Sequence, residues 1–312
     1  MKLKKNKLSE WPQFTNKEIV NVSKILKSKK INYLYGQVGN KFEKNFSKLT
    51  NTKYAIAVSN GTVALELALR SLNISSGEEI ILTPRSYYAS ASSILRLNAK
   101  PIFADVDLNT QNITLKSIKK VFNKKKTKAI ICVHLGGYPC DMKSIMLFAK
   151  KNNIFVIEDC AQAHGAKINN RSVGSFGDVS AWSFCNDKII STGGEGGMVT
   201  TNNKKIWRYI WEYKDQGKNY YKYNKKSDGI SFQYLHDKIG SNYRLTEMQS
   251  SIGLFQISKL NSNIQRRNLY ATMINEKIKN INIVEVVKNK KGLTNAYYKY
   301  YFFLNLKYMK KN

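Results

Sequence analysis

The chain has 312 residues, of which 42% are hydrophobic, and a formal net charge of +31. This length and apolar content predict a folded protein with a sizeable core and exclude a disordered chain. The lysines are spread in short groups without a helix-turn-helix, a zinc pattern or an aromatic-interleaved basic stripe. We therefore expect no specific nucleic-acid partner, although a positive surface would attract anionic substrates.

The chain begins with a basic stretch, residues 1–14, that no apolar segment follows, so we expect no signal peptide and a cytoplasmic protein. No apolar run is long enough to cross a bilayer, and we expect no membrane insertion. The cysteines form no CxxC pair, which favours buried free thiols over a metal site or a disulfide. They are Cys132, Cys140, Cys160 and Cys185.

From residue 54 onward, short apolar runs alternate with amphipathic stretches. Seven runs rich in Ile, Val and Phe mostly lack polar alternation, as buried strands do. They are residues 54–59, 79–83, 101–106, 129–135, 154–158, 179–184 and 197–201. Helical patterns lie between several of them, at 63–72, 115–123 and 142–152. This alternation predicts an α/β fold with a mostly parallel, seven-stranded sheet between helices.

The pattern changes towards the end of the chain. Thr246 and Gln249 form a capping box that begins a long helix. A Tyr- and Phe-rich strand is expected around residues 297–304. We therefore divide the chain into a large domain, residues 1–245, and a small α+β domain, residues 246–312, which we expect to be incomplete. A single aromatic strand there would leave its edges unpaired and its aromatic side chains exposed.

Three segments carry residues suited to chemistry, and the first comprises residues 59–65. It places Gly61 and Thr62 where a predicted strand turns into a helix. Backbone N–H groups at a helix N-terminus, with the helix dipole behind them, bind phosphate readily. A Gly-Thr pair is also compatible with an ordinary helix cap, so this segment alone is a weak signal.

The second segment, residues 154–164, is an apolar strand that ends in Glu158 and Asp159. Open α/β sheets bind their ligands at the carboxyl ends of the strands. The two acids are also compatible with simple strand-end caps. However, Gln162 and His164 follow so closely that three polar groups, with Asp159, gather at one strand end.

The third segment, residues 179–197, places Lys188 between a buried strand and a glycine-rich loop. In so lysine-rich a chain, a lone lysine is usually a solvated surface residue. Here the neighbours are apolar or hydroxyl-bearing on one side and glycines on the other. They predict a desolvated amine with a lowered pKa, which can act as a nucleophile.

Together, the three segments supply the parts of a pyridoxal phosphate site. Such a site needs a phosphate cradle, a carboxylate facing the pyridine nitrogen, and a lysine that forms a Schiff base with the cofactor. The carboxylate keeps the ring nitrogen protonated, so that the ring accepts electrons when the substrate loses its α-proton. The lysine then serves as the base that moves this proton.

The chain resembles the DegT/DnrJ/StrS family of pyridoxal-phosphate-dependent nucleotide-sugar aminotransferases. The resemblance covers about residues 10–300 and follows the family's motif order. It is carried by the segments SNGTVALELAL, TPRSYYASAS, IEDCAQAHGA, VGSFGDVSAWSF, DKIISTGGEGG and GSNYRLTEMQ. It implies the fold-type I aminotransferase architecture and a homodimer with active sites at the subunit interface.

The resemblance also implies roles for single residues around the cofactor ring. By position, Lys188 is the catalytic lysine that carries the cofactor, and Asp159 pairs with the pyridine nitrogen. Gln162 is expected near the phenolic oxygen, and Tyr87 is expected to stack on the ring. The resemblance assigns no definite role to His164.

The phosphate end of the cofactor is assigned in the same way. Gly61, Thr62 and Ser183 would hold the phosphate, and Asn242 would reach it from the neighbouring subunit. One departure from the family is Gln216, which stands where relatives commonly have histidine, so a substrate contact is expected to differ.

The implied activity moves an amino group from an amino acid, with glutamate as the expected donor, onto a nucleotide-linked keto sugar. The 4-keto-6-deoxy type is expected, for surface polysaccharide or amino-sugar biosynthesis. Some relatives replace the lysine with histidine and are sugar 3-dehydratases, which Lys188 argues against. A relative that binds cofactor or sugar nucleotide without full catalytic activity stays open as an alternative, because of the short C-terminus.

Overall fold

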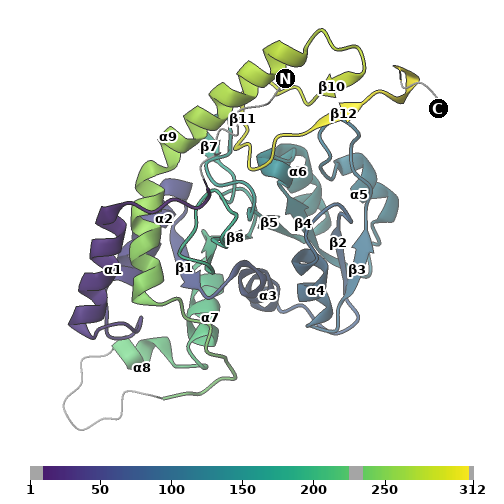
Figure 1. The fold of residues 1–312 in the computed structure, drawn as a ribbon. Coiled ribbons are helices and arrows are strands. Elements are labelled where there is room, and N and C mark those ends of the chain that lie inside the picture. The colour runs from purple at the N-terminus through teal and green to yellow at the C-terminus, as the bar shows by residue number, and fades with distance from the viewer. Residues whose placement is uncertain (1–9, 225–234, 309–312) are drawn as a thin grey trace.

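The computed structural model describes residues 10–224 and 235–308 (Figure 1). Its central sheet has seven strands in the order β1-β9-β8-β5-β4-β2-β3. They are β1 (Tyr54–Val58), β2 (Glu79–Leu82), β3 (Lys100–Phe103), β4 (Thr127–Val133), β5 (Phe155–Asp159), β8 (Val179–Ser183) and β9 (Gly197–Thr201). In this sheet β9 runs antiparallel to both of its neighbours, β1 and β8, and the other adjacent strands pair in parallel. The predicted α/β fold with a mostly parallel sheet is confirmed.

Helices cover both faces of the sheet (Figure 1). They are α1 (Asn16–Ser28), α2 (Val38–Thr50), α3 (Gly61–Ser71), α4 (Ala89–Leu95), α5 (Leu115–Val121), α6 (Met142–Asn152), α7 (Lys204–Lys214), α8 (Tyr220–Asn224) and α9 (Glu247–Ile278). The helices expected at 63–72, 115–123 and 142–152 correspond to α3, α5 and α6.

Alternate residues of the strands feed different hydrophobic clusters, as the two-residue period of a strand requires. On β4, Ile131 packs in the cluster that includes α3, α4 and α7. Its neighbours Ile130 and Cys132 pack in the cluster that includes α5 and α6. Near β8 and β9, a third cluster joins the sheet to α2 and α9. Because both faces are covered, the strands read as continuous apolar runs.

The C-terminal part corrects the expectation of a single aromatic strand. Only β12 (Phe302–Leu304) is a strand in that region, and it pairs antiparallel with β10 (Val284–Val286). Residues 295–301 form an irregular segment. Of the six aromatic residues at 297–303, only Phe302 is exposed. The expected exposed aromatic patch is therefore wrong, because this segment folds back onto the large domain.

The C-terminal region also pairs with strands of the large domain outside the central sheet. The capping box of Thr246 and Gln249 at the start of α9 is confirmed. A short strand, β11 (Leu293–Thr294), joins β6 (Lys167–Ile168) and β7 (Arg171–Ser172) in a three-stranded sheet. Within the two described ranges, no helix is both long and apolar enough to span a bilayer.

Candidate active site

The carboxyl ends of β1, β5 and β8 lie along one edge of the central sheet. After β1 the chain turns at Asn60 and enters α3, and this turn lies against the end of β8. A Cβ atom added to Gly61 would lie 2.6 Å from the Cβ of Ser183. Only glycine fits here without displacing the neighbouring strand, so two of the predicted phosphate residues are in direct contact.

The first turn of α3 offers free N–H donors. The side chain of Asn60 accepts a hydrogen bond from Val63 N at 2.9 Å, and its carbonyl accepts one from Ala64 N at 3.1 Å. Within residues 10–224 and 235–308, no acceptor takes the N–H groups of Gly61 and Thr62. Two free amides at the N-terminus of an 11-residue helix form a suitable cradle for a phosphate.

Asp159 ends β5 and is buried, with 5% of its surface exposed. Burial raises the pKa of Asp159, while hydrogen bonds from Ser90 at 2.8 Å and Ala161 at 3.1 Å oppose this rise. Among the described residues, no cationic side chain forms an ion pair with it. A protonated nitrogen beside this carboxylate would offset its desolvation, as a pyridine nitrogen would.

Lys188 lies in the loop after β8, and its side chain is 16% exposed. Its Nζ is 3.3 Å from the hydroxyl of Tyr298 and 3.4 Å from Oδ1 of Asp187. Burial acts to lower the pKa of Lys188, but Tyr298 and Asp187 outweigh it and the pKa is raised. The expected lowering of this pKa is therefore wrong for this structure, because the sequence did not reveal Tyr298 as a partner.

His164 is fully buried between aromatic rings. Its ring centroid lies 5.4 Å from that of Trp182 and 5.6 Å from that of Phe184. Neither ring nitrogen has a hydrogen-bond partner among the described residues. Burial, together with the nearby charge of Lys188, lowers the pKa of His164 to about 3, so the imidazole is neutral.

This edge thus combines a free amide cradle, a buried carboxylate and a half-buried lysine. The model of the DegT/DnrJ/EryC1/StrS aminotransferase family matches residues 12–311. The chain belongs to this family. It is an enzyme of the pyridoxal-phosphate-dependent transaminase type.

Several aminotransferases of the family are similar to this chain. GDP-perosamine synthase of Escherichia coli O157:H7 is 42% identical over 92% of this chain and 75% of its own length. A dTDP-3-amino-3,6-dideoxy-alpha-D-galactopyranose transaminase of Aneurinibacillus thermoaerophilus is 38% identical over 80% of this chain and 65% of its own. Both names refer to nucleotide-linked amino sugars.

A solved structure supports the family fold independently. The aminotransferase from Psychrobacter cryohalolentis matches with a TM-score of 0.94 and 45% identity, over 97% of this chain and 78% of that one. A GDP-4-keto-6-deoxymannose-3-dehydratase with bound GDP-perosamine matches with a TM-score of 0.86 and 28% identity, over 94% and 78%. The fold-type I aminotransferase architecture is thus confirmed.

The other expected family residues lie near this edge with different partners. The side-chain oxygen of Gln162 accepts a hydrogen bond from Gly136 N at 2.7 Å. Tyr87 is 74% exposed in the loop between β2 and α4. Asn242 is exposed, and its backbone forms a bridge with Asp215. Tyr87 and Asn242 are therefore accessible to a molecule outside this chain.

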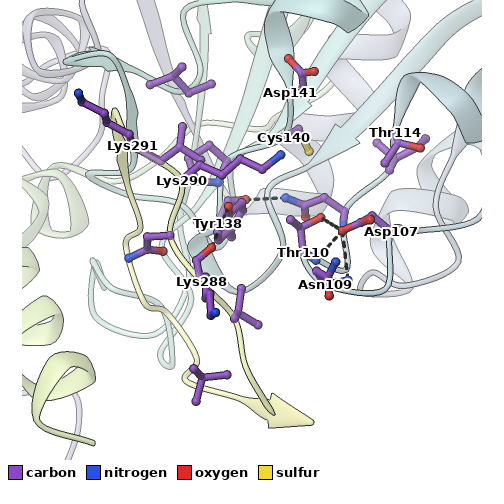
Figure 2. A pocket seen from close by; sticks show the side chains of 18 of the residues that line it. Asp107, Asn109, Thr110, Thr114, Tyr138, Cys140, Asp141, Lys288, Lys290 and Lys291 are labelled. Atoms are coloured by element: carbon purple, nitrogen blue, oxygen red, sulfur yellow. Dashed lines mark hydrogen bonds between the residues drawn. The ribbon is translucent and has the colours of Figure 1, made fainter. Parts of the chain in front are cut away.

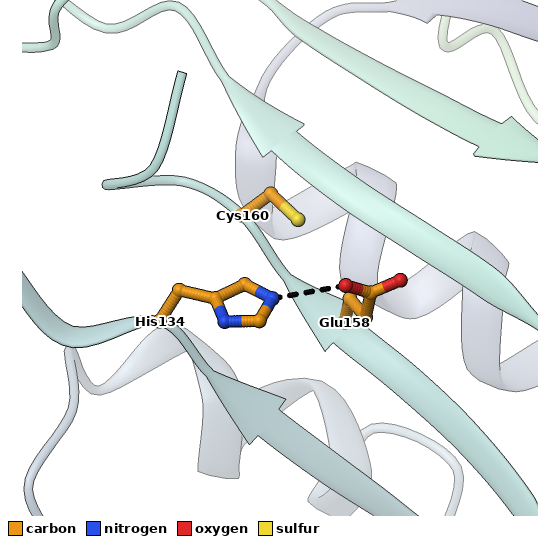
Figure 3. A group of neighbouring side chains, drawn as sticks. All are labelled: His134, Glu158 and Cys160. Atoms are coloured by element: carbon orange, nitrogen blue, oxygen red, sulfur yellow. Dashed lines mark hydrogen bonds and ion pairs between the residues drawn. The ribbon is translucent and has the colours of Figure 1, made fainter. Parts of the chain in front are cut away.

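A second polar cluster includes Glu158 and Cys160, the two chain neighbours of Asp159 (Figure 3). One ligand atom each of His134, Glu158 and Cys160 lies within 4.8 Å of the others, a spacing that a metal ion could bridge. However, Glu158 already accepts hydrogen bonds from the N–H groups of Gly174, Phe176 and Gly177. The oxygens of this carboxylate are thus already occupied by hydrogen bonds from the backbone, which leaves them poorly suited to bind a metal ion.

Both ring nitrogens of His134 in this cluster also have hydrogen-bond partners. Nδ1 of His134 accepts from Cys140 N, and Nε2 lies 3.0 Å from Oε2 of Glu158. Burial acts to raise the pKa of Glu158, but His134 and the N–H donors outweigh it and lower the pKa. We interpret this cluster as a buried structural network that supports the strand end carrying Asp159.

The structure also contains a cavity of about 1140 Å³ (Figure 2). It is bordered by the loop around Asp107, the turn around Tyr138 and the lysines of the segment 284–293. None of the predicted site residues lines it. This cavity is therefore not the candidate active site.

Two residues at the site were missed by sequence reasoning. Ser90, which donates to Asp159, lies inside the motif TPRSYYASAS, which offered a signal that was not used. Tyr298 is 110 residues from Lys188, and no local pattern links the two.

The cysteines were expected to be buried free thiols. All four are free thiols and three of them are buried, but Cys185 is only half-buried.

Proposed function

We propose that this enzyme transfers an amino group from an amino acid, with glutamate as the expected donor, to a GDP-linked 4-keto-6-deoxy sugar. Pyridoxal phosphate is the proposed cofactor. The observation that carries the reaction type is Lys188, a half-buried lysine at the same edge as the buried carboxylate of Asp159.

The proposed cofactor fits the donor set of the site. Gly61 and Thr62 would donate free backbone N–H groups to the phosphate, and Ser183 would add a hydroxyl group. Asp159 would hold a proton on the ring nitrogen, because burial disfavours its charge unless a cation lies beside it. When bound, pyridoxal phosphate supplies an electron sink for cleavage of the substrate's Cα–H bond.

Lys188 would have two tasks at this site. Its Nζ is the proposed point of covalent attachment, and after release it would take the proton from the donor's α-carbon. As the neutral amine, Nζ would accept this proton and hold it as an ammonium group, from which it would be returned to carbon in the second half of the transfer. Tyr87 would stack on the face of the cofactor ring, and Gln162 would lie near its phenolic oxygen.

The sugar nucleotide is proposed from the relatives. The curated proteins of Escherichia coli O157:H7, Vibrio cholerae and Caulobacter vibrioides that match this chain are all named GDP-perosamine synthase, at 42%, 34% and 38% identity. The solved dehydratase that matches at a TM-score of 0.86 acts on GDP-4-keto-6-deoxymannose. These names support a guanosine diphosphate and a keto group at carbon 4.

We also propose that the active form is a homodimer. The exposed Asn242 is available to a neighbouring subunit, where it would approach the phosphate cradle. Its backbone bridge to Asp215 fixes its position at the surface. The dimer would then complete each active site with a residue from the other chain.

A panel of keto-sugar nucleotides tests the proposal. Purified enzyme with pyridoxal phosphate and glutamate should aminate a GDP-linked 4-keto-6-deoxyhexose, with a lower kcat/KM for the dTDP- and UDP-linked analogues. Product mass and 2-oxoglutarate release are measured together, and Lys188→Ala is the inactive control. Equal or better turnover of a dTDP- or UDP-linked sugar would refute the proposed substrate but not the transaminase activity.

The alternatives predict other outcomes in the same assay. A 3-dehydratase would give a 3-deoxy keto sugar while glutamate is oxidised to 2-oxoglutarate and its nitrogen leaves as ammonia, so no amino group would appear on the sugar. A relative that only binds the sugar nucleotide would leave all keto sugars unchanged. Lys188 argues against the first alternative, because the relatives that are sugar 3-dehydratases have histidine in place of this lysine.

A further inference from the structure

The amino group of Lys188 has two partners from separate parts of the chain. Its Nζ donates to the Tyr298 hydroxyl at 3.3 Å and lies 3.4 Å from Oδ1 of Asp187. The Tyr298 hydroxyl in turn donates a hydrogen bond to Oδ2 of Asp187. The three groups therefore form a closed ring of polar contacts at the site.

The position of Tyr298 is fixed independently of Lys188. Ala296 N donates to the carbonyl of Gly137 at 3.0 Å. From α9, Arg267 donates to the carbonyl of Tyr297 at 2.9 Å, and Asn268 donates to that of Asn295 at 2.9 Å. These contacts hold the residues directly before Tyr298, and Lys299 N donates to the carbonyl of Gly136 at 3.4 Å on its other side, so the Tyr298 side chain reaches the lysine from a rigid support.

The backbone of Lys188 is also held, which leaves its side chain as the part that can move. Lys188 N donates to the carbonyl of Cys185 at 3.1 Å, and the indole of Trp11 donates to the carbonyl of Lys188 at 3.0 Å. Rotation about the side-chain bonds can therefore shift Nζ between its partners and another position in the site without moving the loop.

The choice of partner matters because two carboxylates face this amino group. The charge of Lys188 also acts on Asp159 of β5 and on the neutral His164, and Arg267 of α9 lies near Tyr298. In the part of the chain that the structure describes, Nζ forms an ion pair with Asp187 and none with Asp159. Asp159 thus stays available for another cation.

We propose that Asp187 and Tyr298 form a docking pair for Lys188, which holds Nζ as an ammonium group in the cofactor-free enzyme. This inference rests on the proposed role of Lys188 as the attachment point. A lysine attacks a carbonyl carbon only as the neutral amine. The docking pair therefore keeps the amino group in place and away from Asp159 before the cofactor binds, and slows its first capture of the cofactor.

The test measures the protonation of Lys188 directly in the cofactor-free full-length chain. Trace acetylation with acetic anhydride over a range of pH, followed by peptide mass spectrometry, gives the apparent pKa of this single amine. The variants are Asp187→Asn and Tyr298→Phe, which remove the charge and the hydroxyl with little change of shape. The matched control is Tyr300→Phe, because the Tyr300 hydroxyl donates to Asn275 at 2.6 Å and does not contact Lys188.

We expect both variants to lower the apparent pKa of Lys188 by about one unit, which gives about ten times more neutral amine at a fixed pH below it. The pKa should be unchanged in Tyr300→Phe. Added pyridoxal phosphate should then be captured faster by both variants than by the control, as followed by the change in visible absorbance.

Two outcomes separate this inference from the proposed function. If borohydride fixes the cofactor on Lys188 but neither variant changes the pKa or the capture rate, the docking pair is refuted and the attachment point stands. If the reduced cofactor is recovered on another lysine, the proposed attachment point itself is wrong. A pKa shift in both variants and not in the control supports the pair.

Discussion

The hydroxyl of Ser90 donates a 2.8 Å hydrogen bond to Oδ2 of Asp159, although 69 residues separate the two in the sequence. Ser90 lies on α4, directly after the exposed loop that contains Tyr87, and Asp159 ends β5. The bond therefore connects the loop expected to cover the cofactor ring with the carboxylate expected to hold the ring nitrogen. It also opposes the rise in the pKa of Asp159 that burial causes.

Replacing the carboxylate tests its proposed role. We expect Asp159→Asn to retain bound cofactor but to lose at least about a hundredfold in kcat, about 3 kcal/mol, because a neutral amide does not stabilise a protonated ring nitrogen. Steady-state rates and the cofactor content of the purified variant are measured together.

The matched control is Asp178→Asn. Asp178, directly before β8, accepts a hydrogen bond from Val156 N at 2.8 Å at the opposite end of β5, so it contacts the same strand but lies outside the site. Near-normal turnover in Asp159→Asn, or an equal loss in Asp178→Asn, would contradict the assignment.

Removing the serine should shift a pH profile. In Ser90→Ala the pKa of Asp159 should rise further, because a hydrogen bond that lowers it is lost. The carboxylate would then become protonated at higher pH, and the acid limb of kcat/KM against pH should move upward by about half a unit to one unit. Ser93→Ala on the same helix is the control, since Ser93 donates to the carbonyl of Ala89. A profile that does not move would show that the bond has no influence on the titrating group.

The network around Glu158 should be important for stability. We expect Glu158→Gln to lower the free energy of unfolding by about 2–4 kcal/mol, because the fully buried carboxylate accepts from three N–H groups and contacts His134. An amide cannot accept with its nitrogen, so at least one donor loses its partner. Urea unfolding followed by circular dichroism gives the difference.

A surface glutamate provides the comparison for Glu158→Gln. Glu276 pairs with Lys279 on the exposed side of α9, and Glu276→Gln should change the stability by less than about 0.5 kcal/mol. Equal effects of the two substitutions would mean that the buried network contributes nothing specific.

His164 should make the fold sensitive to acid. Its pKa is about 3 in the folded protein, against an ordinary value of 6.5 in the unfolded chain. Below pH 6.5 the unfolded chain binds a proton that the folded protein excludes, so stability falls as the pH decreases from 6.5 towards 3. Between neutral pH and pH 5 this residue alone should cost about 2 kcal/mol.

The variant His164→Leu isolates that contribution. It removes the titrating group from between Trp182 and Phe184 and keeps an apolar side chain in their place. Its stability should fall less than that of the unchanged protein over the same pH interval, as measured by urea unfolding at several pH values. Parallel curves for the two proteins would refute the assigned pKa.

Hybrid dimers test the proposed contribution of Asn242 across the interface. Lys188→Ala and Asn242→Ala chains should each be inactive or weak alone. Mixed and refolded together, they should regain up to about a quarter of the full activity, because one site of each hybrid dimer combines an intact Lys188 with an intact Asn242 from the partner. Full activity of a monomer, measured by light scattering with a simultaneous assay, would end this proposal.

The sequence by itself determined the sheet and the order of its motifs. Buried strands covered by helices on both faces read as continuous apolar runs, so periodicity located all seven strands of the central sheet. The capping box at Thr246 was equally local, since its two partners are three residues apart. The resemblance then supplied the family, which the match over residues 12–311 confirms.

Only the tertiary structure decided the partners of the site residues. Ser90 reaches Asp159 across 69 residues and Tyr298 reaches Lys188 across 110, so no window of the sequence contains both members of either pair. For the same reason the direction of the Lys188 pKa was predicted wrongly. Burial was visible in the neighbouring apolar residues, but the opposing hydroxyl comes from a segment that α9 and the 136–137 turn place there. A pKa depends on the sum of contacts in space, and local sequence fixes only a part of that sum.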